Sequence, residues 1–362
     1  MSAIAITNAN VYNHETGKFS PQTVLVKDNK IQAVAAPAEP SQGYRVINAE
    51  GGYLTPGFID ACSQIGLKEI GVRWEGNDGY EPLEENMADL QVIDGIYPFD
   101  QAFQDAVAFG VTAAHIVSAA ESIKGVKTAV IHTHGKTADE MILRNKLGYS
   151  FSMGDVPKKA FWDKTHTPLT RMGIAHQIRT SLKELQKQEH VPETPIFIRC
   201  NRTDDIATAL RIAKEFNLRL ILVHASEYPK IAGQLTEQDF SIIAGPCFQP
   251  IEREELRGLS PSLYRVLSEE HGQFAFTTDH PVSSVKHLQL EGALAVKAGV
   301  PEKIVLNGLT HYGARLLQID HLTGAIKAGL FADLVIWNKH PLHLTARAVR
   351  TFIKGKEVYR WE

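Results

Sequence analysis

Two histidines separated by one residue form a pattern that suggests metal binding. His132 and His134 lie in the string VIHTHGK, and a strand would point both side chains to one face, because alternate residues of a strand share a face. His115, or His224 together with Asp279, could complete a ligand set. Imidazoles and carboxylates bind zinc, and bound zinc lowers the pKa of water toward neutrality, which permits metal-assisted hydrolysis. The alternative is that these are ordinary hydrogen-bonded histidines.

A cysteine suggests a second kind of chemistry, nucleophilic catalysis. A thiolate at Cys62 would need a nearby base and an orienting acid, and His224 and Asp279 are candidates for these roles. The alternative is a small buried thiol that fills space in the core. The cysteines, Cys62, Cys200 and Cys247, form no CxxC pair, so we expect neither a disulfide framework nor a zinc knuckle.

Composition and charge exclude several classes of function. The chain has 362 residues, of which 44% are hydrophobic and 22% charged, and its formal net charge is −3. This balance gives no electrostatic basis for binding nucleic acid or an anionic membrane. The first residues lack a basic segment followed by an apolar one, and no run approaches the roughly 20 apolar residues of a transmembrane helix. We therefore expect a cytoplasmic protein whose partner is a small molecule.

Both ends of the chain show the short alternating pattern of antiparallel strands. Residues 1–54 contain the strings AIAITNANVYN, QTVLVKDNKIQAVAA and YRVINAEG, separated by turn-forming residues. Residues 325–362 return to this pattern in AIKAGLFADLVIWNKHPL and VRTFIKGKEVYRW. We expect the two segments to form one small composite β-sandwich domain.

Residues 55–324 alternate between apolar runs and helical patterns. Seven runs are typical of strands buried on both faces: GFIDA, GVTAAHIV, TAVIHTH, PIFIRC, LRLILVHA, FSIIAG and QFAFTTD. Between them, strings such as DDIATALRIAKEFN and SPSLYRVLSEEHG have the apolar spacing of helices. An eighth strand is expected between Lys136 and Pro195. The alternation predicts an α/β fold, a (β/α)8 TIM barrel with parallel strands.

Three stretches resemble sequences of the amidohydrolase superfamily and occur in the family's order. VINAEGGYLTPGFIDA resembles the segment that leads into the first barrel strand, TTDHP the region of the eighth-strand aspartate, and GAIKAGLFADLVIWNKHPL the returning β domain. Further strings, RWEGNDGYE, IDGIYPFDQAF, TRMGIAHQIR, RTDDIATALRIA and HASEYPKIA, resemble the imidazolonepropionase-related branch. The resemblance implies a TIM barrel with a β domain and hydrolysis of C–N or C–O bonds by one or two divalent metal ions.

Several positions where the resemblance places metal ligands carry side chains of another kind. Cys62 and Gln64 stand in place of the first-strand HxH pair, and the fifth-strand imidazole falls on Arg199 and Asn201. A thiolate can bind zinc, but glutamine is a poor ligand, and a protonated guanidinium cannot coordinate a cation. The resemblance therefore implies a degenerate metal site.

His224 and Asp279 match family positions that remain intact. The resemblance implies that they are the catalytic residues, since the sixth-strand histidine binds metal and the eighth-strand aspartate binds metal and moves the proton. Two groups cannot supply the three protein ligands of a catalytic zinc site, so we expect no metal cofactor. Zinc or another divalent metal is expected only if a relocated site forms from His132, His134, His224, Asp279 and Cys62.

Arginines dominate the candidate substrate-binding residues. We expect Arg199 to form an ion pair with Asp279 at the barrel mouth, since a buried aspartate needs a compensating cation when no metal is present. The candidate substrate-binding residues are Arg199, Arg73, Glu75, Arg171 and Arg202. The alternatives are an ordinary polar loop for the residues of RWEGNDGYE and structural ion pairs or caps for the other arginines.

Two functions are compatible with these residues. The first is a hydrolase of non-peptide C–N bonds that acts on a cyclic amide-like substrate. The second is a non-catalytic relative that keeps the fold and the pocket and serves as a ligand-binding, regulatory or homo-oligomeric partner protein. Loss of the first-strand and fifth-strand imidazoles favours the second, whereas His224 and Asp279 as base and orienting residue leave the first open.

Overall fold

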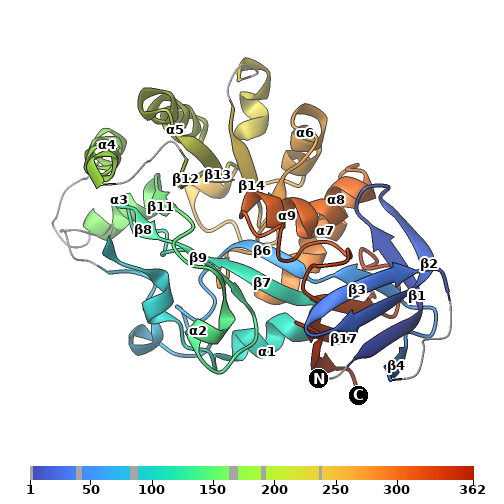
Figure 1. Ribbon diagram of the computed structural model, residues 1–362. Coiled ribbons are helices and arrows are strands. Elements are labelled where there is room, and N and C mark those ends of the chain that lie inside the picture. The colour runs from blue at the N-terminus through green and yellow to red at the C-terminus, as the bar shows by residue number, and fades with distance from the viewer. Residues whose placement is uncertain (1–2, 38–42, 82–88, 163–169, 189–192, 236–238) are drawn as a thin grey trace.

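The computed structural model describes residues 3–37, 43–81, 89–162, 170–188, 193–235 and 239–362. Helices lie outside a set of central strands, and a separate sheet lies to one side (Figure 1). No helix in these ranges has both the length and the apolar composition needed to cross a membrane.

The sheet at the side contains strands from both ends of the chain. Its eight strands include the hydrogen-bonded order β18-β17-β16-β5-β1-β2-β3, and β4 pairs with β1. Both chain termini lie beside it (Figure 1). The strands are β1 (Ile4–Asn13), β2 (Lys18–Lys27), β3 (Lys30–Ala35), β4 (Arg45–Asn48), β5 (Tyr53–Pro56), β16 (Leu334–Trp337), β17 (Ala348–Ile353) and β18 (Lys356–Arg360).

The central strands include all the apolar runs predicted from the sequence. Two strands, β10 and β11, lie between Lys136 and Pro195, where the sequence predicted one; β11, formed by the string YSFS, pairs parallel to β12, whereas β10 pairs antiparallel to β9. The central strands are β6 (Phe58–Ser63), β7 (Val111–Ile116), β8 (Val126–Lys127), β9 (Ala129–His132), β10 (Ile142–Arg144), β11 (Tyr149–Ser152), β12 (Pro195–Cys200), β13 (Arg219–His224), β14 (Ser241–Ala244) and β15 (Ala275–Phe276).

These strands form two sheets, with the orders β10-β9-β7-β6 and β15-β14-β13-β12-β11-β8. Within the described ranges no strand ladder closes them into one barrel, although the backbone N–H of Gln64 donates to His280 O at 2.9 Å where the sheets meet. The prediction of parallel strands throughout is wrong, because β9 runs antiparallel to β7 and β8 antiparallel to β11. The connection from β7 to β9 contains no helix, and a parallel return usually requires one.

The helices cover the outer faces of the central strands, with α4, α5 and α6 outside β12, β13 and β14 (Figure 1). Asn217 ends α5 in the left-handed conformation, which favours asparagine and glycine. The helices are α1 (Gln101–Ala108), α2 (Ala138–Met141), α3 (Asp155–Trp162), α4 (Arg171–Gln188), α5 (Thr203–Phe216), α6 (Ser262–Glu270), α7 (Leu288–Lys297), α8 (Glu302–Leu309) and α9 (His311–Leu316).

Successive side chains of the parallel strands point to opposite faces of the sheet, and the two faces belong to two different apolar clusters. Phe197 and Val223 belong to a cluster inside the central strands, whereas Ile198 and Leu222 belong to the larger cluster shared with the helices. Apolar residues therefore cover both faces of β12 and β13, as expected for buried parallel strands. Arg199 follows Phe197 by two residues, so its side chain also points inward.

Candidate functional site

A pocket of about 330 Å³ lies at the carboxyl ends of β12 and β13. Carboxyl ends of parallel strands are where barrel enzymes place their active sites. The residues that line it include Gln64, Lys68, Glu121, Ser152, Arg199, Asn201, His224, Gln249, Glu252, Arg253, Glu255 and Asp279. The pocket thus brings together Arg199, His224 and Asp279, which the sequence marked as candidates.

A buried ion pair joins Arg199 to Asp279, as the sequence predicted. Arg199 Nη2 donates to Asp279 Oδ1 at 2.9 Å, and the two side chains are 5% and 6% exposed. Arg199 Nη2 also lies 3.5 Å from Cys62 Sγ, and Nη1 donates to the carbonyl of Ser118. The guanidinium is therefore held in the wall of the pocket by several acceptors at once.

His224 reaches Asp279 through an unusual backbone conformation. Strict alternation along β13 would point its side chain outward with Leu222, but its φ of 73° turns the end of the strand. Its Nδ1 donates to the carbonyl of Gly245 at 2.7 Å, and its Nε2 lies 3.3 Å from Asp279 Oδ2. Both ring nitrogens thus face oxygen atoms, which fixes the orientation of the ring.

Asp279 is held as a carboxylate between these two groups. Burial acts to raise its pKa, but the neighbouring Arg199 and then His224 outweigh burial and lower the pKa to about 2. Asp279 also has a positive φ, 46°, so two residues of the cluster adopt a backbone conformation that ordinary side chains disfavour. Such backbone strain is common where a fold holds functional side chains in fixed directions.

Cys62 packs beside the ion pair as a neutral thiol. Its Sγ lies 3.8 Å from Asp279 Oδ1, and the side chain is buried. Burial raises the pKa of the thiol well above its ordinary value, although Arg199 acts in the opposite direction. A thiolate is therefore disfavoured here, which argues against the predicted Cys62 nucleophile and for the alternative of a small thiol that fills space.

The side chains around Asp279 do not fit a divalent metal ion. Arg199 already donates to the carboxylate, and a permanently charged guanidinium repels a cation instead of ligating it. A zinc site needs three protein ligands. Here the third side chain beside His224 and Asp279 is that of Cys62, a buried neutral thiol. In the part of the chain that the structure describes, no group of three or more His, Cys, Asp or Glu side chains is arranged to hold a metal.

The structure separates His132 and His134 from this pocket. Strand β9 ends at His132, so His134 lies beyond it, and the prediction that one strand face carries both is wrong. Antiparallel pairing sets His132 opposite Ala113, toward the start of β7, whereas the pocket lies at strand ends. His132 Nε2 lies 3.0 Å from Asp333 Oδ2, and His134 is exposed. A relocated site built on this pair is therefore not assembled.

His115 is a packed core histidine. Its Nδ1 lies 2.9 Å from the carbonyl of Ala61, and its ring lies 4.3 Å from that of Phe197. Burial lowers its pKa to about 3, so the ring is neutral at physiological pH. This agrees with the alternative of an ordinary hydrogen-bonded histidine.

Arg171 belongs to an ion-pair network at the pocket rim. Its Nε donates to Asp205 Oδ2 at 3.0 Å, and its Nη2 donates to Glu255. Arg253 on the same rim donates to Asp155. Burial raises the pKa of Glu255 to about 7, and Asp155 and Asp205 add to this effect. The network connects α3, α4 and α5 around the pocket, which supports the structural alternative for Arg171.

The other predicted substrate-binding residues lie outside the pocket wall. Arg202 Nε donates to Asp204 Oδ1 at 3.1 Å near the start of α5. Arg73 and Glu75 are exposed around the short 3-10 helix η1 (Trp74–Gly76), whose Trp74 is 84% exposed. Arg73 and Glu75 therefore agree better with an ordinary polar loop, and Arg202 with a structural ion pair, than with contact to a ligand in the pocket.

Asp60 is a site residue that our sequence reasoning missed. It is fully buried and accepts hydrogen bonds from Thr277 Oγ1 at 2.9 Å and from the backbone N–H of Thr278 at 3.0 Å. Burial raises its pKa to about 6. These bonds join β6 to the segment that carries Asp279. An acidic residue inside the apolar run GFIDA was the signal that could have identified it.

Residues 100–358 match the Amidohydrolase family. This chain belongs to that family. An amidohydrolase structure from Thermotoga maritima MSB8 has a TM-score of 0.93 and 31% identity, covering 99% of this chain and 100% of that one. A structure of 5-methylcytosine deaminase from Klebsiella pneumoniae, liganded with 5-fluorocytosine, has a TM-score of 0.63 and 13% identity. The match covers 99% of this chain and 98% of that one, and at this identity it shows a shared fold alone.

A curated relative, Amidohydrolase tasK from Hapsidospora irregularis, is 23% identical over 381 residues. The match covers 91% of this chain but 38% of the relative, so this chain spans well under half of that protein's length. The fold is the mixed α/β fold of amidohydrolase-superfamily neighbours, which are TIM barrels.

Proposed function

We propose that this amidohydrolase-family chain binds a small polar molecule at the barrel mouth and does not hydrolyse C–N bonds by the metal-dependent route. The observation that carries the proposal is the 2.9 Å hydrogen bond from Arg199 Nη2 to Asp279 Oδ1. The guanidinium supplies the positive charge that the buried carboxylate requires, and it does so without an exchangeable ion. We also propose that the chain belongs to the imidazolonepropionase-related branch, because several of its strings resemble sequences of that branch.

The state of Asp279 supports the loss of hydrolysis. A group with a pKa of about 2 is a weak base at neutral pH, whereas efficient general bases have pKa values near the working pH. Its two oxygens already face Arg199 Nη2 and His224 Nε2. The carboxylate is therefore stabilised as an ion and poorly placed to accept a proton from water.

The polar atoms of the pocket wall favour a ligand that both donates and accepts hydrogen bonds. Gln64 Oε1, Ser152 Oγ and Arg199 Nε are buried and have no hydrogen-bond partner within the described ranges. Gln249 and Arg253, which also line the pocket, add an amide and a guanidinium to its wall. Asn201 also lines this pocket. A cyclic amide, or the open-chain carbamoyl acid related to it, combines an N–H donor with carbonyl acceptors.

The test measures binding and turnover of dihydrouracil and carbamoyl-β-alanine by isothermal titration calorimetry and chromatography. We expect saturable binding of one of the two compounds, at least tenfold weaker in Asn201→Leu and unchanged in Asn338→Leu, a control at the exposed position directly after β16. We expect no ring opening, with or without added zinc. Zinc-dependent ring opening by the wild-type protein would overturn the proposal, as would the absence of binding by both compounds.

Hydrolysis of a C–N bond without metal is the second candidate. It is favoured by the position of His224, whose side chain is 13% exposed in the pocket wall beside Asp279. This function predicts ring opening that survives treatment with a chelator and is lost in His224→Asn. Ring opening of that kind would replace the first proposal with the second.

A further inference from the structure

A buried carboxylate holds the loop that follows β14. Glu291, in the first turn of α7, is fully buried. Its Oε2 accepts a hydrogen bond from the backbone N–H of Cys247 at 2.9 Å, and its Oε1 accepts one from the backbone N–H of Phe248 at 2.8 Å. The hydroxyl of Tyr264 on α6 also donates to Oε2. Three donors from the loop and from a neighbouring helix therefore meet on one side chain.

The surroundings of Glu291 are specific for a carboxylate. Burial raises the pKa of Glu291, and the three hydrogen bonds act in the opposite direction. A buried charge is costly, and donors to both of its oxygens offset part of that cost. An amide in the same place would set an N–H group opposite one of these donors, because an amide has a single oxygen.

The loop held by Glu291 orients the ring of His224. Gly245, the first residue after β14, accepts a hydrogen bond from His224 Nδ1 at 2.7 Å through its carbonyl. Since a carbonyl oxygen carries no proton, Nδ1 carries the proton of this bond, and Nε2 is the ring atom that faces Asp279 at 3.3 Å. Gly245 has a φ of 99°, and a Cβ atom there would lie 2.7 Å from the Tyr264 hydroxyl oxygen. The Glu291–Tyr264 pair thus packs against the residue whose carbonyl fixes the ring.

The same loop continues into the wall of the pocket at the barrel mouth. Gln249 and Pro250 line this pocket and directly follow Phe248. The Oγ of Ser283 donates to the carbonyl of Phe248 at 2.9 Å, so the loop is also tied to the segment after β15. A change at Glu291 would therefore reach both the imidazole and the pocket wall.

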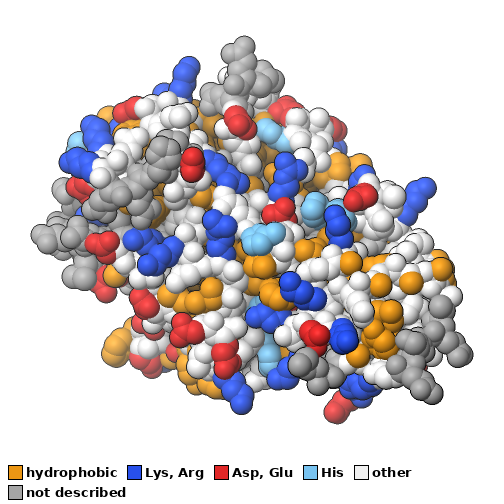
Figure 2. Space-filling model, viewed as in Figure 1, with side chains coloured by type: hydrophobic (Ala, Val, Ile, Leu, Met, Phe, Trp, Pro, Cys, Tyr) orange, Lys and Arg blue, Asp and Glu red, His pale blue; other side chains and the backbone are white. Residues whose placement is uncertain are grey.

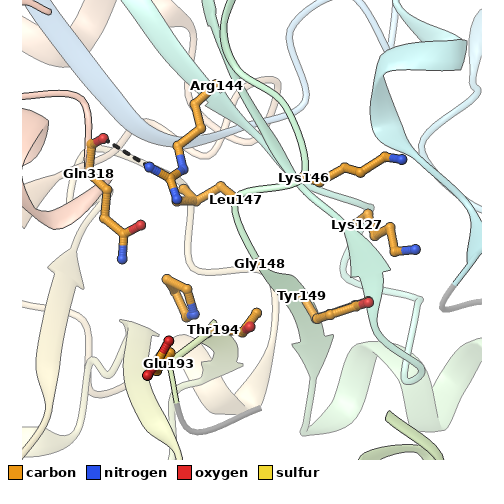
Figure 3. A pocket seen from close by; sticks show the side chains of 10 residues that line it. Lys127, Arg144, Lys146, Leu147, Gly148, Tyr149, Glu193, Thr194 and Gln318 are labelled. Atoms are coloured by element: carbon orange, nitrogen blue, oxygen red, sulfur yellow. Dashed lines mark hydrogen bonds between the residues drawn. The ribbon is translucent and has the colours of Figure 1, made fainter. Parts of the chain in front are cut away.

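Two other groups of charged side chains do not converge in this way. On the face shown in Figure 2, Lys and Arg side chains are interspersed with those of Asp and Glu. A second cavity, of about 580 Å³, lies at the opposite ends of β11 and β12, whose first residues line it. There the side chain of Arg144 points away from those of Lys127 and Lys146 (Figure 3). Convergence on a single buried group distinguishes Glu291 from these charges.

We propose that Glu291 is a positioning residue for the site at the barrel mouth. By holding the loop after β14, it fixes the tautomer and the direction of His224 and the pocket wall at Gln249. It acts through the carbonyl of Gly245, which the loop carries. Its effect on ligand affinity rests on the function proposed for the mouth, whereas its effect on the His224 ring does not.

The experiment measures hydrogen exchange of the His224 ring N–H by NMR in the full chain with isotope-labelled histidine. The signal is assigned by its absence in His224→Asn. Glu291→Gln keeps the size of the side chain and removes one acceptor, and Tyr264→Phe removes only the hydroxyl donor. Thermal unfolding of each variant reports its stability.

Two control variants separate positioning from a general loss of stability. Glu270→Gln changes another carboxylate that accepts from a tyrosine hydroxyl, that of Tyr228 at 2.7 Å, outside this loop. His132→Ala removes the buried partner of Asp333 in the other central sheet. Neither of these side chains forms a hydrogen bond with the loop within the described ranges.

We expect the His224 N–H to exchange at least about tenfold faster in Glu291→Gln than in the wild type, because two loop N–H groups lose a matched acceptor. Tyr264→Phe should give a smaller increase, and both controls should leave the exchange unchanged. Equal exchange in the wild type and Glu291→Gln would overturn the proposal, as would an equal increase in His132→Ala. If Glu291→Gln does not fold, faster exchange in Tyr264→Phe supports the proposal and unchanged exchange overturns it.

The affinity for dihydrouracil and carbamoyl-β-alanine tests the effect on the pocket. We expect the compound that the wild type binds to bind about tenfold more weakly, or less, to Glu291→Gln and equally well to Glu270→Gln. Equal affinity in the wild type and Glu291→Gln would overturn the role of Glu291 at the pocket wall. Absence of binding by the wild type would refute the function proposed for the mouth, and the exchange of the His224 N–H would still decide the role of Glu291.

Discussion

Removing the Arg199 guanidinium is expected to destabilise the protein strongly. Arg199→Met keeps much of the apolar stem but removes the donors to Asp279 and to the Ser118 carbonyl. The carboxylate of Asp279, 6% exposed, is then left without its closest cation. Breaking a buried ion pair from one side typically costs about 3–5 kcal/mol, because a buried charge is left uncompensated. We expect a loss of this size in the free energy of unfolding at pH 7, measured by urea denaturation.

Two comparison variants separate this effect from a general loss of packing. Arg179→Met breaks an ion pair in which Arg179 Nε lies 2.6 Å from Glu215 Oε2, but these side chains are 30% and 45% exposed. Exposed pairs contribute about 0–1 kcal/mol, so this control should change stability little. The double variant Arg199→Met/Asp279→Asn should be more stable than Arg199→Met alone, because no buried charge is left unpaired.

The reasoning is refuted if Arg199→Met unfolds within about 1 kcal/mol of the wild type. It is also refuted if the double variant is less stable than the single variant. Either result would mean that the charge of Asp279 does not depend on the guanidinium.

Other predictions follow from the same geometry. The folded pKa of Asp279, about 2, lies below the unfolded value of about 3.9, so this group stabilises the fold above pH 4, and about 2–3 kcal/mol is lost as pH falls toward 2. The acid dependence of urea unfolding should therefore be shallower in Asp279→Asn. Alkylation of Cys62 by iodoacetamide, followed by peptide mass spectrometry, should be slow in the native protein and fast in urea; rapid native labelling would contradict its burial. His132→Ala should lower the free energy of unfolding by about 1–3 kcal/mol because Asp333 loses its buried partner, whereas His134→Ala should leave it unchanged; equal effects would argue against the placement of His132.

Regular alternation explains which site residues the sequence could predict. Arg199 lies two residues after Phe197 on a strand with apolar residues on both faces, so its inward direction follows from the period of a strand. Strand period alone does not bring Arg199 and Asp279 together. The family resemblance did, because it placed them at the fifth-strand and eighth-strand site positions, where a buried aspartate needs a compensating cation.

Other features depend on contacts that no local pattern encodes. Alternation alone would turn His224 away from the pocket, and its φ of 73° reverses that direction. The string TAVIHTH has the composition of a barrel strand, but its antiparallel pairing with β7 places His132 beside Asp333, 201 residues later in the chain. Glu255 reaches Arg171 across a separation of 84 residues. Pairing partners so distant in sequence are set by tertiary packing.

Metal content tests the central claim most directly. The protein would be purified without chelator, loaded with excess zinc or manganese, desalted and measured by inductively coupled plasma mass spectrometry, with His224→Ala as the comparison. Since Arg199 supplies the charge beside Asp279, we expect well below one equivalent of metal in both proteins. About one equivalent in the wild type that disappears in His224→Ala would contradict the account and restore a metal-dependent hydrolase.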